Sequence, residues 1–385
     1  MANVLLLHCD VDSLLAPDGY LTGRLADGDH ELVVAAPSAS RDVVSTLHRR
    51  GGTFEPMPLD GPPDSAAELH RRLGWLEPVV RRRRPDYLLA DTVDGLVYGL
   101  VASWLADVPS RYALIANPGC VDGASVDTRQ YLLQKVASTL YRLRSTPNGR
   151  TSLDGGKEIP LASARRLVGG RDRGVFVAAA GVDVRDHHYV EAPEELSFLM
   201  IDDGDDSKAI ADYARAVDRI QQRHGDVECR LARWLDGGPD VVEISRVRDF
   251  VDGNADKYVG EVDDVADSLG RAAVYVWPSR RRRLSKTVLQ AMSTGRPVVT
   301  TDCSGGRYAV DSGVNGFVVP PDDVDALTRA MLHFVGEPGL RRRFGDVSRT
   351  RAVDDFDVEE VADSVLRALE LATRRVPPPI PRDAV

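Results

Sequence analysis

Short apolar runs alternate with amphipathic segments along most of the chain. Up to about residue 120, the pattern predicts strands at 4–8, 32–36, 87–90 and 112–116, with helices at 19–26, 66–82 and 96–105. Such an alternation is typical of a parallel α/β sheet. A further amphipathic helix is predicted at 130–143, and the following residues, up to about 190, are polar, glycine-rich and less regular.

A second α/β series is predicted from about residue 196. Its segments are a strand at 196–201, a helix with apolar residues at 210, 213, 217 and 220, strands at 227–234 and 241–244, a helix capped by Asp322 or Asp323, and a last helix at 356–371. Apolar positions three and four residues apart indicate one buried helix face. The simplest division is two α/β halves with a break within 165–195, followed by a proline-rich tail.

The segment 272–320 holds the clearest strand–helix–strand unit. An apolar run at 273–277 precedes a basic loop, and Leu284, Val288, Leu289 and Met292 then fit one helix face. Gly295 is predicted to end that helix, and a second β-branched run follows at 297–301. Open parallel sheets bind ligands where their strands end, and helix N-termini favour anions, so this loop is a candidate binding site.

Length and composition limit the classes of function. A chain of 385 residues favours two domains, and a net charge of −10 argues against a general nucleic-acid binder. The four cysteines form no C-x-x-C pair, which fits a reduced, cytoplasmic protein without a zinc site or a disulfide framework. The sequence shows no signal peptide and no apolar run long enough to span a membrane. Arginine clusters at 81–84, 280–283 and 341–343 are interpreted as solvated faces, the second at a strand end.

Residues 258–373 resemble the C-terminal half of the group 1 (family 4-like) retaining glycosyltransferases of the GT-B fold. The strings that carry the resemblance are YVGEVDDVADSLGRAAVYVWPS, LQAMSTGRPVVTTD, GVNGFVVPPDDVDALTRAML and LRRRFGDVSRTRAVDDF. The first half is similar more loosely, through PDGYLTGRLADGDHELVVAAP and RRRRPDYLLAD. The resemblance is weakest between about residues 120 and 190.

The resemblance implies two Rossmann-like domains that face each other across a cleft. We expect an N-terminal acceptor domain at 1–190, a nucleotide-sugar domain at 191–355, a helix at 356–372 that crosses back to the first domain, and a tail at 373–385. The implied reaction moves a sugar from a nucleoside-diphosphate sugar to the hydroxyl of a glycan, lipid-linked or protein acceptor. It would retain the anomeric configuration and need neither metal nor cofactor.

The resemblance also implies a donor site, in which this chain departs from the family. Lys208 matches a phosphate-binding lysine, but Asp203 stands where the family has an arginine. Two family glutamates, eight residues apart, are replaced by Arg282 and Gln290. The remaining donor-binding candidates are Gly19, Lys286, the N–H groups of Thr287 and Val288, and Gly305. One hypothesis is that Arg282, or Arg280, Arg281 or Arg283 beside it, replaces the cation missing at Asp203.

Candidate catalytic residues on the acceptor side are Asp91 and Asn117, where the family often has histidines. Either side chain can orient an acceptor, but an amide such as Asn117 cannot act as a base. Tyr308 or Ala309 stands where an acidic residue is usual after the Gly-Gly turn. Two possible metal sites, Asp10 with Asp12 and His187–His188 with Glu191, are weaker interpretations.

Three functions remain open. The first is an active, metal-independent glycosyltransferase. The second is a non-catalytic GT-B protein that regulates or stabilises another transferase, favoured by the departures at Asp91, Asn117, Asp203, Arg282 and Gln290. The third, a nucleotide-sugar epimerase of the same fold, is disfavoured because the string QAMSTGRPVV matches the group 1 family better.

Overall fold

The computed structural model describes two parallel sheets and the helices that cover them. The described residues are 2–7, 23–25, 30–37, 39–57, 66–90, 99, 102, 105–106, 108, 110–114, 175–176, 181–202, 207–234, 258–262, 265–280 and 284–368. The helix predicted at 130–143, the strand at 241–244 and the tail lie outside these ranges, as does most of the helix predicted at 96–105.

The first sheet contains the N-terminal strands. They are β1 (Asn3–Leu7), β2 (Glu31–Ala36), β3 (Thr53–Pro56), β4 (Tyr87–Ala90), β5 (Ser110–Leu114) and β6 (Val175–Phe176). The spatial order is β3-β2-β1-β4-β5-β6, and all neighbouring pairs are parallel. Helices α3 (Arg41–Arg49) and α4 (Ala66–Arg83) belong to this half. The strand predicted at 112–116 begins and ends two residues earlier, at Ser110 and Leu114.

The second sheet repeats the same order. Its strands are β7 (Ser197–Asp202), β8 (Glu228–Trp234), β9 (Tyr258–Val262), β10 (Val274–Trp277), β11 (Val298–Thr301) and β12 (Gly316–Val319). They are arranged β12-β11-β10-β7-β8-β9, again with parallel neighbours. Counted within each half, both sheets therefore have the order 3-2-1-4-5-6 of a doubly wound dinucleotide-binding fold.

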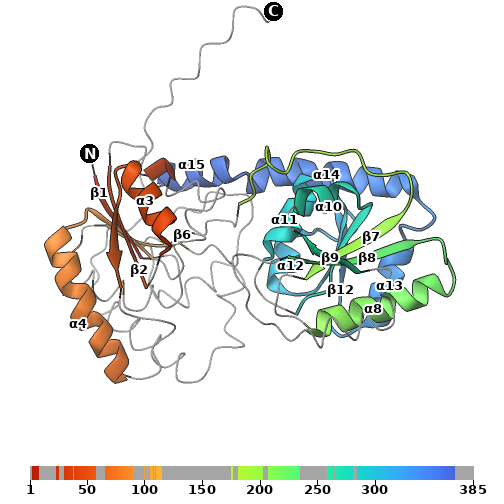
Figure 1. Ribbon diagram of the computed structural model, residues 1–385, viewed down its shortest axis with the longest axis horizontal. Helices are drawn as coiled ribbons and strands as arrows, with labels where there is room; N and C mark the ends of the chain where they lie inside the picture. The colour runs from red at the N-terminus through yellow and green to blue at the C-terminus, as the bar shows by residue number, and fades with distance from the viewer. Residues whose placement is uncertain are drawn as a thin grey trace, which may run out of the picture.

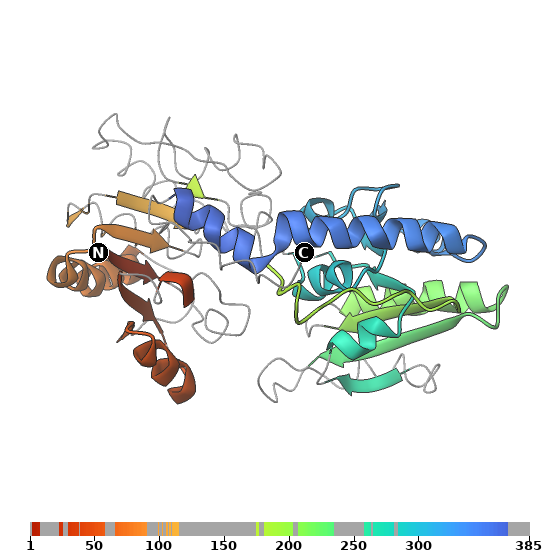
Figure 2. The ribbon, with the colours of Figure 1, turned by 90° about the horizontal axis from the view of Figure 1, so that it is seen from above.

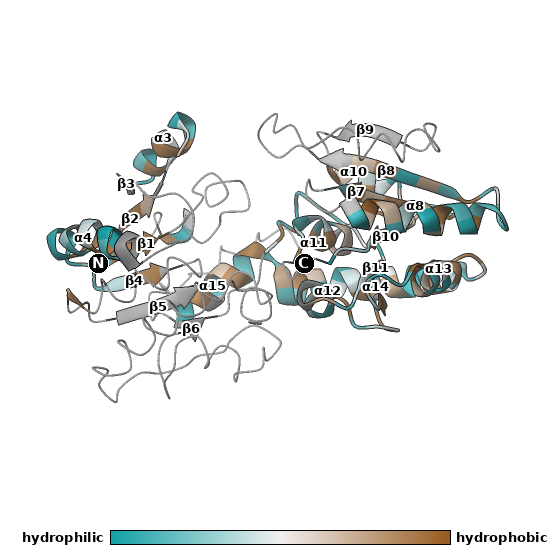
Figure 3. Ribbon diagram, turned by 90° about the horizontal axis from the view of Figure 1, so that it is seen from below, coloured by the Kyte–Doolittle hydropathy of each residue, from teal (hydrophilic) through white to brown (hydrophobic). Residues whose placement is uncertain are grey.

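Helices cover both faces of the second sheet (Figure 1). They are α8 (Ser207–Gln221), α10 (Val265–Gly270), α11 (Lys286–Ser293), α12 (Ser304–Ala309), α13 (Val324–Leu332) and α14 (Pro338–Phe356). Alternate residues of β7 enter different cores, because successive strand side chains point to opposite faces. Phe198 packs with α8 and α13, whereas Leu199 packs with α10, α11 and α14. Figure 3 shows hydrophilic and hydrophobic residues alternating along α8, as expected for a helix with one buried face.

The C-terminal helix α15 (Val358–Ala368) returns to the first sheet (Figure 2). Val365 and Leu366 are buried in one cluster with Val4 and Leu6 of β1, and Arg24 donates to Asp363. The crossing helix implied by the resemblance is therefore present. It starts later than predicted, because Phe356 ends α14 and Asp357 has extended backbone.

The segment 181–196 leads into β7 of the second sheet. Main-chain hydrogen bonds hold it where α14 ends and α15 begins. Val182 N–H donates to Phe356 O at 2.8 Å, and Val358 N–H donates to Val182 O at 3.2 Å. Arg341 is also involved, since it donates to Glu194 O at 2.8 Å. The interpretation of 341–343 as a wholly solvated face is wrong for Arg341, which is 5% exposed. Across the described ranges, no helix combines the length and apolar content that a membrane span requires.

Candidate active site

The topology points to the carboxyl ends of two central strands of the second sheet as the candidate ligand site. Strands β7 and β10 are neighbours in space, although β8 and β9 lie between them in sequence. The chain leaves β7 toward one side of the sheet and β10 toward the other, and the crevice between two such connections is the usual ligand site of open α/β sheets. The helices that follow these strands, α8 and α11, supply the candidate donor residues Lys208, Lys286, Thr287, Val288 and Gln290.

Buried hydroxyl groups fix the start of α11. The Thr287 Oγ1 atom lies 2.6 Å from the Tyr275 hydroxyl of β10 and 2.7 Å from the Ser285 Oγ atom. Thr287 and Tyr275 are both fully buried. The Val288 N–H group donates to Ser285 O at 3.2 Å, so that donor is already engaged within the first turn. This network ties the positive end of α11 to β10.

Gln290 lies one turn further along α11 and is 4% exposed. Its Nε2 atom is 2.9 Å from the Nε2 atom of His187, in the 181–196 segment. Its Oε1 atom is buried and has no hydrogen-bond partner among the described residues. A buried, unpaired acceptor costs about 1–3 kcal/mol, so this oxygen gains free energy when it meets a hydroxyl donor.

Charged residues gather where α8 begins and β10 ends. Lys208 is exposed in the first turn of α8. Arg280 donates through Nη2 to Asp212 Oδ2 at 2.6 Å and through Nε to Asp322 Oδ1 at 2.8 Å. Burial opposes the charge of Arg280, but its hydrogen bonds and charge contacts with Asp322 and Asp212 raise its pKa overall. The hydrogen bond from Arg280 in turn lowers the pKa of Asp322.

These ion pairs bear on the proposed replacement of the missing phosphate-binding cation. Much of the Arg280 charge is neutralised by Asp212 and Asp322, so Arg280 is a poor candidate for that role. The main candidate, Arg282, lies outside the described residues together with Arg281, Arg283 and Asp203. Gly19, Asp91, Asn117 and the Asp10–Asp12 pair also lie outside them. The roles of these residues therefore stay predictions.

The Gly-Gly turn lies at the start of α12. Gly305 is buried, and the Cys303 Sγ atom caps the helix by accepting from the Gly306 N–H group at 3.3 Å. The Tyr308 ring packs edge-on against Phe356, with the ring centroids 5.6 Å apart. Burial raises the pKa of Tyr308 to about 12, so it stays protonated at neutral pH. Tyr308 thus does not replace the acidic residue that is usual after this turn.

The possible metal site at His187, His188 and Glu191 is not supported. These three residues are described, yet no cluster of three or more potential metal ligands forms anywhere in the described ranges. His187 contacts Gln290 instead.

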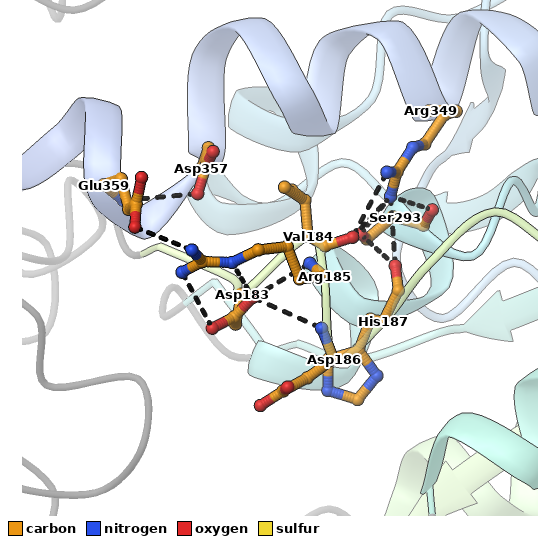
Figure 4. Close-up of polar contacts among 9 residues, drawn as sticks. All are labelled: Asp183, Val184, Arg185, Asp186, His187, Ser293, Arg349, Asp357 and Glu359. Atoms are coloured by element: carbon orange, nitrogen blue, oxygen red, sulfur yellow. Dashed lines mark hydrogen bonds and ion pairs between the residues drawn. The ribbon is translucent and has the colours of Figure 1, made fainter. Parts of the chain in front are cut away.

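The segment around His187 is bound tightly to its surroundings (Figure 4). Arg349 of α14 donates through Nη1 to His187 O at 3.0 Å and through both terminal nitrogens to Val184 O at 3.1 Å. Arg185 pairs with Glu359 of α15 at 2.8 Å. The segment between the sheets is therefore linked to α11, α14 and α15 at once.

Comparison with known proteins identifies this architecture. Residues 200–337 match the family model for group 1 glycosyl transferases. Across 97% of its length the chain superimposes on 100% of Alr3699/HepE from Anabaena, crystallised with UDP, with a TM-score of 0.71 and 16% sequence identity. The chain has the GT-B fold, and its second half is similar to the group 1 glycosyl transferases.

The curated relatives cover only part of the chain. It is 28% identical to the glycogen synthase of Mycobacterium tuberculosis over 46% of the chain and 42% of that protein. It is also 28% identical to the D-inositol 3-phosphate glycosyltransferase of Kribbella flavida, over 55% of the chain and 47% of that protein. The match thus spans less than half the length of each relative.

The residues that match the group 1 family include the described donor candidates. They do not include His187, which contacts Gln290. Lys208, Lys286, Gln290 and Gly305 all lie within 200–337, whereas His187 precedes this range. Sequence reasoning considered His187 only as a metal ligand or a surface residue. A contact between positions 103 residues apart has no signal in a single sequence.

Proposed function

We propose that this protein is a glycosyltransferase that moves a sugar from a nucleoside-diphosphate sugar to an acceptor hydroxyl. The observation that carries the proposal is that α8 and α11 follow the neighbouring central strands β7 and β10, within the residues that match the group 1 family. The first turns of these two helices supply a lysine and a helix N-terminus, and α11 also carries the buried amide of Gln290. These groups suit a ribose and a diphosphate.

The proposed chemistry is electrostatic. As the bond between the sugar and the diphosphate breaks, negative charge grows on the leaving phosphate. Lys208 and the N-terminus of α11 would stabilise that charge, with Lys286 in the same first turn. The leaving phosphate would take the proton of the acceptor hydroxyl, which needs no protein base and no metal and retains the anomeric configuration. Asp91 and Asn117 would orient the acceptor.

UDP is the first donor nucleotide to test, because the similar structure of Alr3699/HepE contains it. The acceptor would be a glycan, a lipid-linked molecule or a protein, and we place the reaction in the cytoplasm. UDP, GDP and ADP, each free and as a glucose or mannose conjugate, form a compact panel. We expect one nucleotide to raise the melting temperature and its sugar conjugate to be hydrolysed slowly without an acceptor.

A charge substitution tests the site itself. Lys208→Met should weaken binding of the selected nucleotide about tenfold, because a hydrogen bond to a charged group contributes about 1.5–3 kcal/mol. Arg219→Met is the matched control, since Arg219 is on the same helix but pairs with Asp325. Equal affinities of the Lys208 variant and the wild type would exclude this lysine from the donor site.

One observation favours a second candidate, a non-catalytic partner of another transferase. Arg280, at the end of β10, is held by two carboxylates, and Asp203 and Gln290 replace charged family residues. A protein that no longer binds a nucleotide donor would show no change in melting temperature with any nucleotide of the panel. That result would favour this candidate over the enzyme.

A further inference from the structure

We propose that His187 is a positioning residue for the nucleotide donor. It holds the side-chain amide of Gln290 in one orientation and thereby determines how the site recognises a ribose hydroxyl. This inference rests on the proposed function, because it assumes that Gln290 faces the donor ribose. It adds a residue from outside the family match and a reason why an amide can replace a glutamate here.

The polarity of the contact between Gln290 and His187 follows from its atoms. The two Nε2 atoms are 2.9 Å apart, and an amide Nε2 can only donate. We infer that His187 accepts through an unprotonated Nε2 atom and carries its proton on Nδ1. With the amide nitrogen engaged in this way, the oxygen is the end of Gln290 that is left for a ligand. That oxygen is the buried acceptor without a hydrogen-bond partner among the described residues.

The main chain of His187 is fixed in place, so its ring can serve as a reference point. The His187 N–H group donates to Asp183 O at 3.0 Å. The His187 carbonyl accepts from Ser293 Oγ at 2.5 Å and from Arg349 Nη1 at 3.0 Å. Ser293 is on the same helix as Gln290, so the imidazole and the amide are held by one local framework.

An amide needs such a partner, whereas a carboxylate does not. Both oxygens of a glutamate accept, so either orientation presents an acceptor to a ribose hydroxyl. A glutamine that rotates by half a turn presents an NH₂ group instead, and the hydroxyl would then have to accept. The contact with His187 removes that second orientation. Loss of the imidazole should therefore matter with glutamine at position 290 and matter little with glutamate there.

Binding measurements with UDP, 2′-deoxy-UDP and 3′-deoxy-UDP test this dependence. We expect the wild type to prefer UDP about tenfold over the analogue that lacks the recognised hydroxyl, since an unmet buried polar group costs about 1–3 kcal/mol. His187→Phe should reduce this preference to within about twofold. In a Gln290→Glu background the same replacement should leave the preference unchanged. His188→Phe is the matched control, because His188 is the exposed neighbour.

The outcomes distinguish a failure of the proposed function from a failure of the role assigned to His187. A wild type that binds no nucleotide of the UDP, GDP and ADP panel contradicts the proposed function and this inference together. A His187→Phe variant that is folded by circular dichroism and keeps the tenfold preference overturns this inference alone. A measurement without ligand is also decisive. Nitrogen-15 NMR of the wild-type imidazole should show the proton of His187 on Nδ1, and a proton on Nε2 would overturn the inference.

Discussion

Arg349 of α14 donates through one nitrogen, Nη1, to both the carbonyl and the hydroxyl oxygen of Ser293 at 2.8 Å, where α11 ends. The same nitrogen contacts His187 O. A single guanidinium thus joins the donor-site helix, the segment between the sheets and the long helix α14. Burial lowers the pKa of Arg349, which shows that the charge is partly removed from water. The position of His187 beside Gln290 therefore depends on this arginine.

Removal of this cation should destabilise the protein. Arg349→Ala removes this donor from the carbonyl groups of Val184 and Ser293 and leaves that of His187 with the Ser293 hydroxyl alone, so we expect a loss of about 3 kcal/mol in the free energy of unfolding. Urea unfolding followed by circular dichroism measures the change. Arg342→Ala, at an exposed position of the same helix, should change stability by less than about 0.5 kcal/mol. Similar losses in the two variants would contradict the role assigned to Arg349.

Gly345 allows α14 to approach the end of α11. A Cβ atom there would lie 3.3 Å from the carbonyl carbon of Gly295 and closer still to its oxygen. Gly345→Ala should therefore cost about 2 kcal/mol or more, despite the higher helix propensity of alanine. Gly339→Ala, in the same helix, meets no atom within 4 Å and should be neutral or slightly stabilising. Opposite melting shifts of the two variants are the expected result, and a stabilised Gly345 variant would contradict this packing.

The sequence predicted elements whose signals are local. Gly295 ends α11 in the left-handed region with φ of 85°, as its position before Pro297 indicated. Asp323, one of two predicted caps, accepts from the Ala326 N–H group at 2.8 Å. The apolar runs at 273–277 and 297–301 became β10 and β11. Each of these features depends on residues within a few positions of one another.

The missed features depend on distant partners. Helix α14 was not predicted, because small residues such as Gly345, Ser348 and Ala352 form much of its buried face and give no apolar stripe. The arginines at 341–343 were interpreted as solvated, yet Arg341 binds a carbonyl group far away in sequence, and so does Arg349, for which no role was predicted. The family resemblance marked Lys208 and Gln290 as donor candidates, and their roles stay predictions. The contact of Gln290 with His187 required the folded chain.

Arg296 is a fully buried cation with few hydrogen-bond partners among the described residues. It donates to Val190 O at 2.6 Å, while its Nε and Nη1 atoms have no hydrogen-bond partner among the described residues. Burial lowers the pKa of Arg296 to about 10. Replacing a buried charge with an apolar residue of similar length is often neutral or stabilising. Arg296→Met should therefore remain within about 1 kcal/mol of the wild type.

Arg296→Ala is the contrasting variant, because it removes the charge but also leaves a cavity. It should cost about 3 kcal/mol, as large-to-small changes in packed cores do. Guanidinium unfolding curves of both variants decide between the two effects. If Arg296→Met loses as much stability as Arg296→Ala, the charge and its contact with Val190 matter more than the packing of the stem.

The negative charge of Asp322 should weaken the binding of a diphosphate at the donor site. It lies beside Arg280 and electrostatically close to Lys208, which both lower its pKa. Because this pKa lies below the usual carboxyl value of about 4, the contact contributes stability above that value and loses it as the pH falls through the lowered pKa. At neutral pH Asp322 is charged and should oppose a bound diphosphate. Asp322→Asn should therefore bind UDP about threefold more tightly than the wild type.

Asp325→Asn is a suitable control for this substitution. Asp325 is nearby in sequence and similarly exposed, but it pairs with Arg219, away from Arg280. Calorimetric titration with UDP at low and high salt would measure both variants. The gain of Asp322→Asn should shrink at high salt, because the distance over which exposed charges interact falls from about 10 Å at 0.1 M to about 3 Å at 1 M. An equal gain in the control variant would indicate a general effect of net charge, and no gain in either would place the diphosphate away from Arg280.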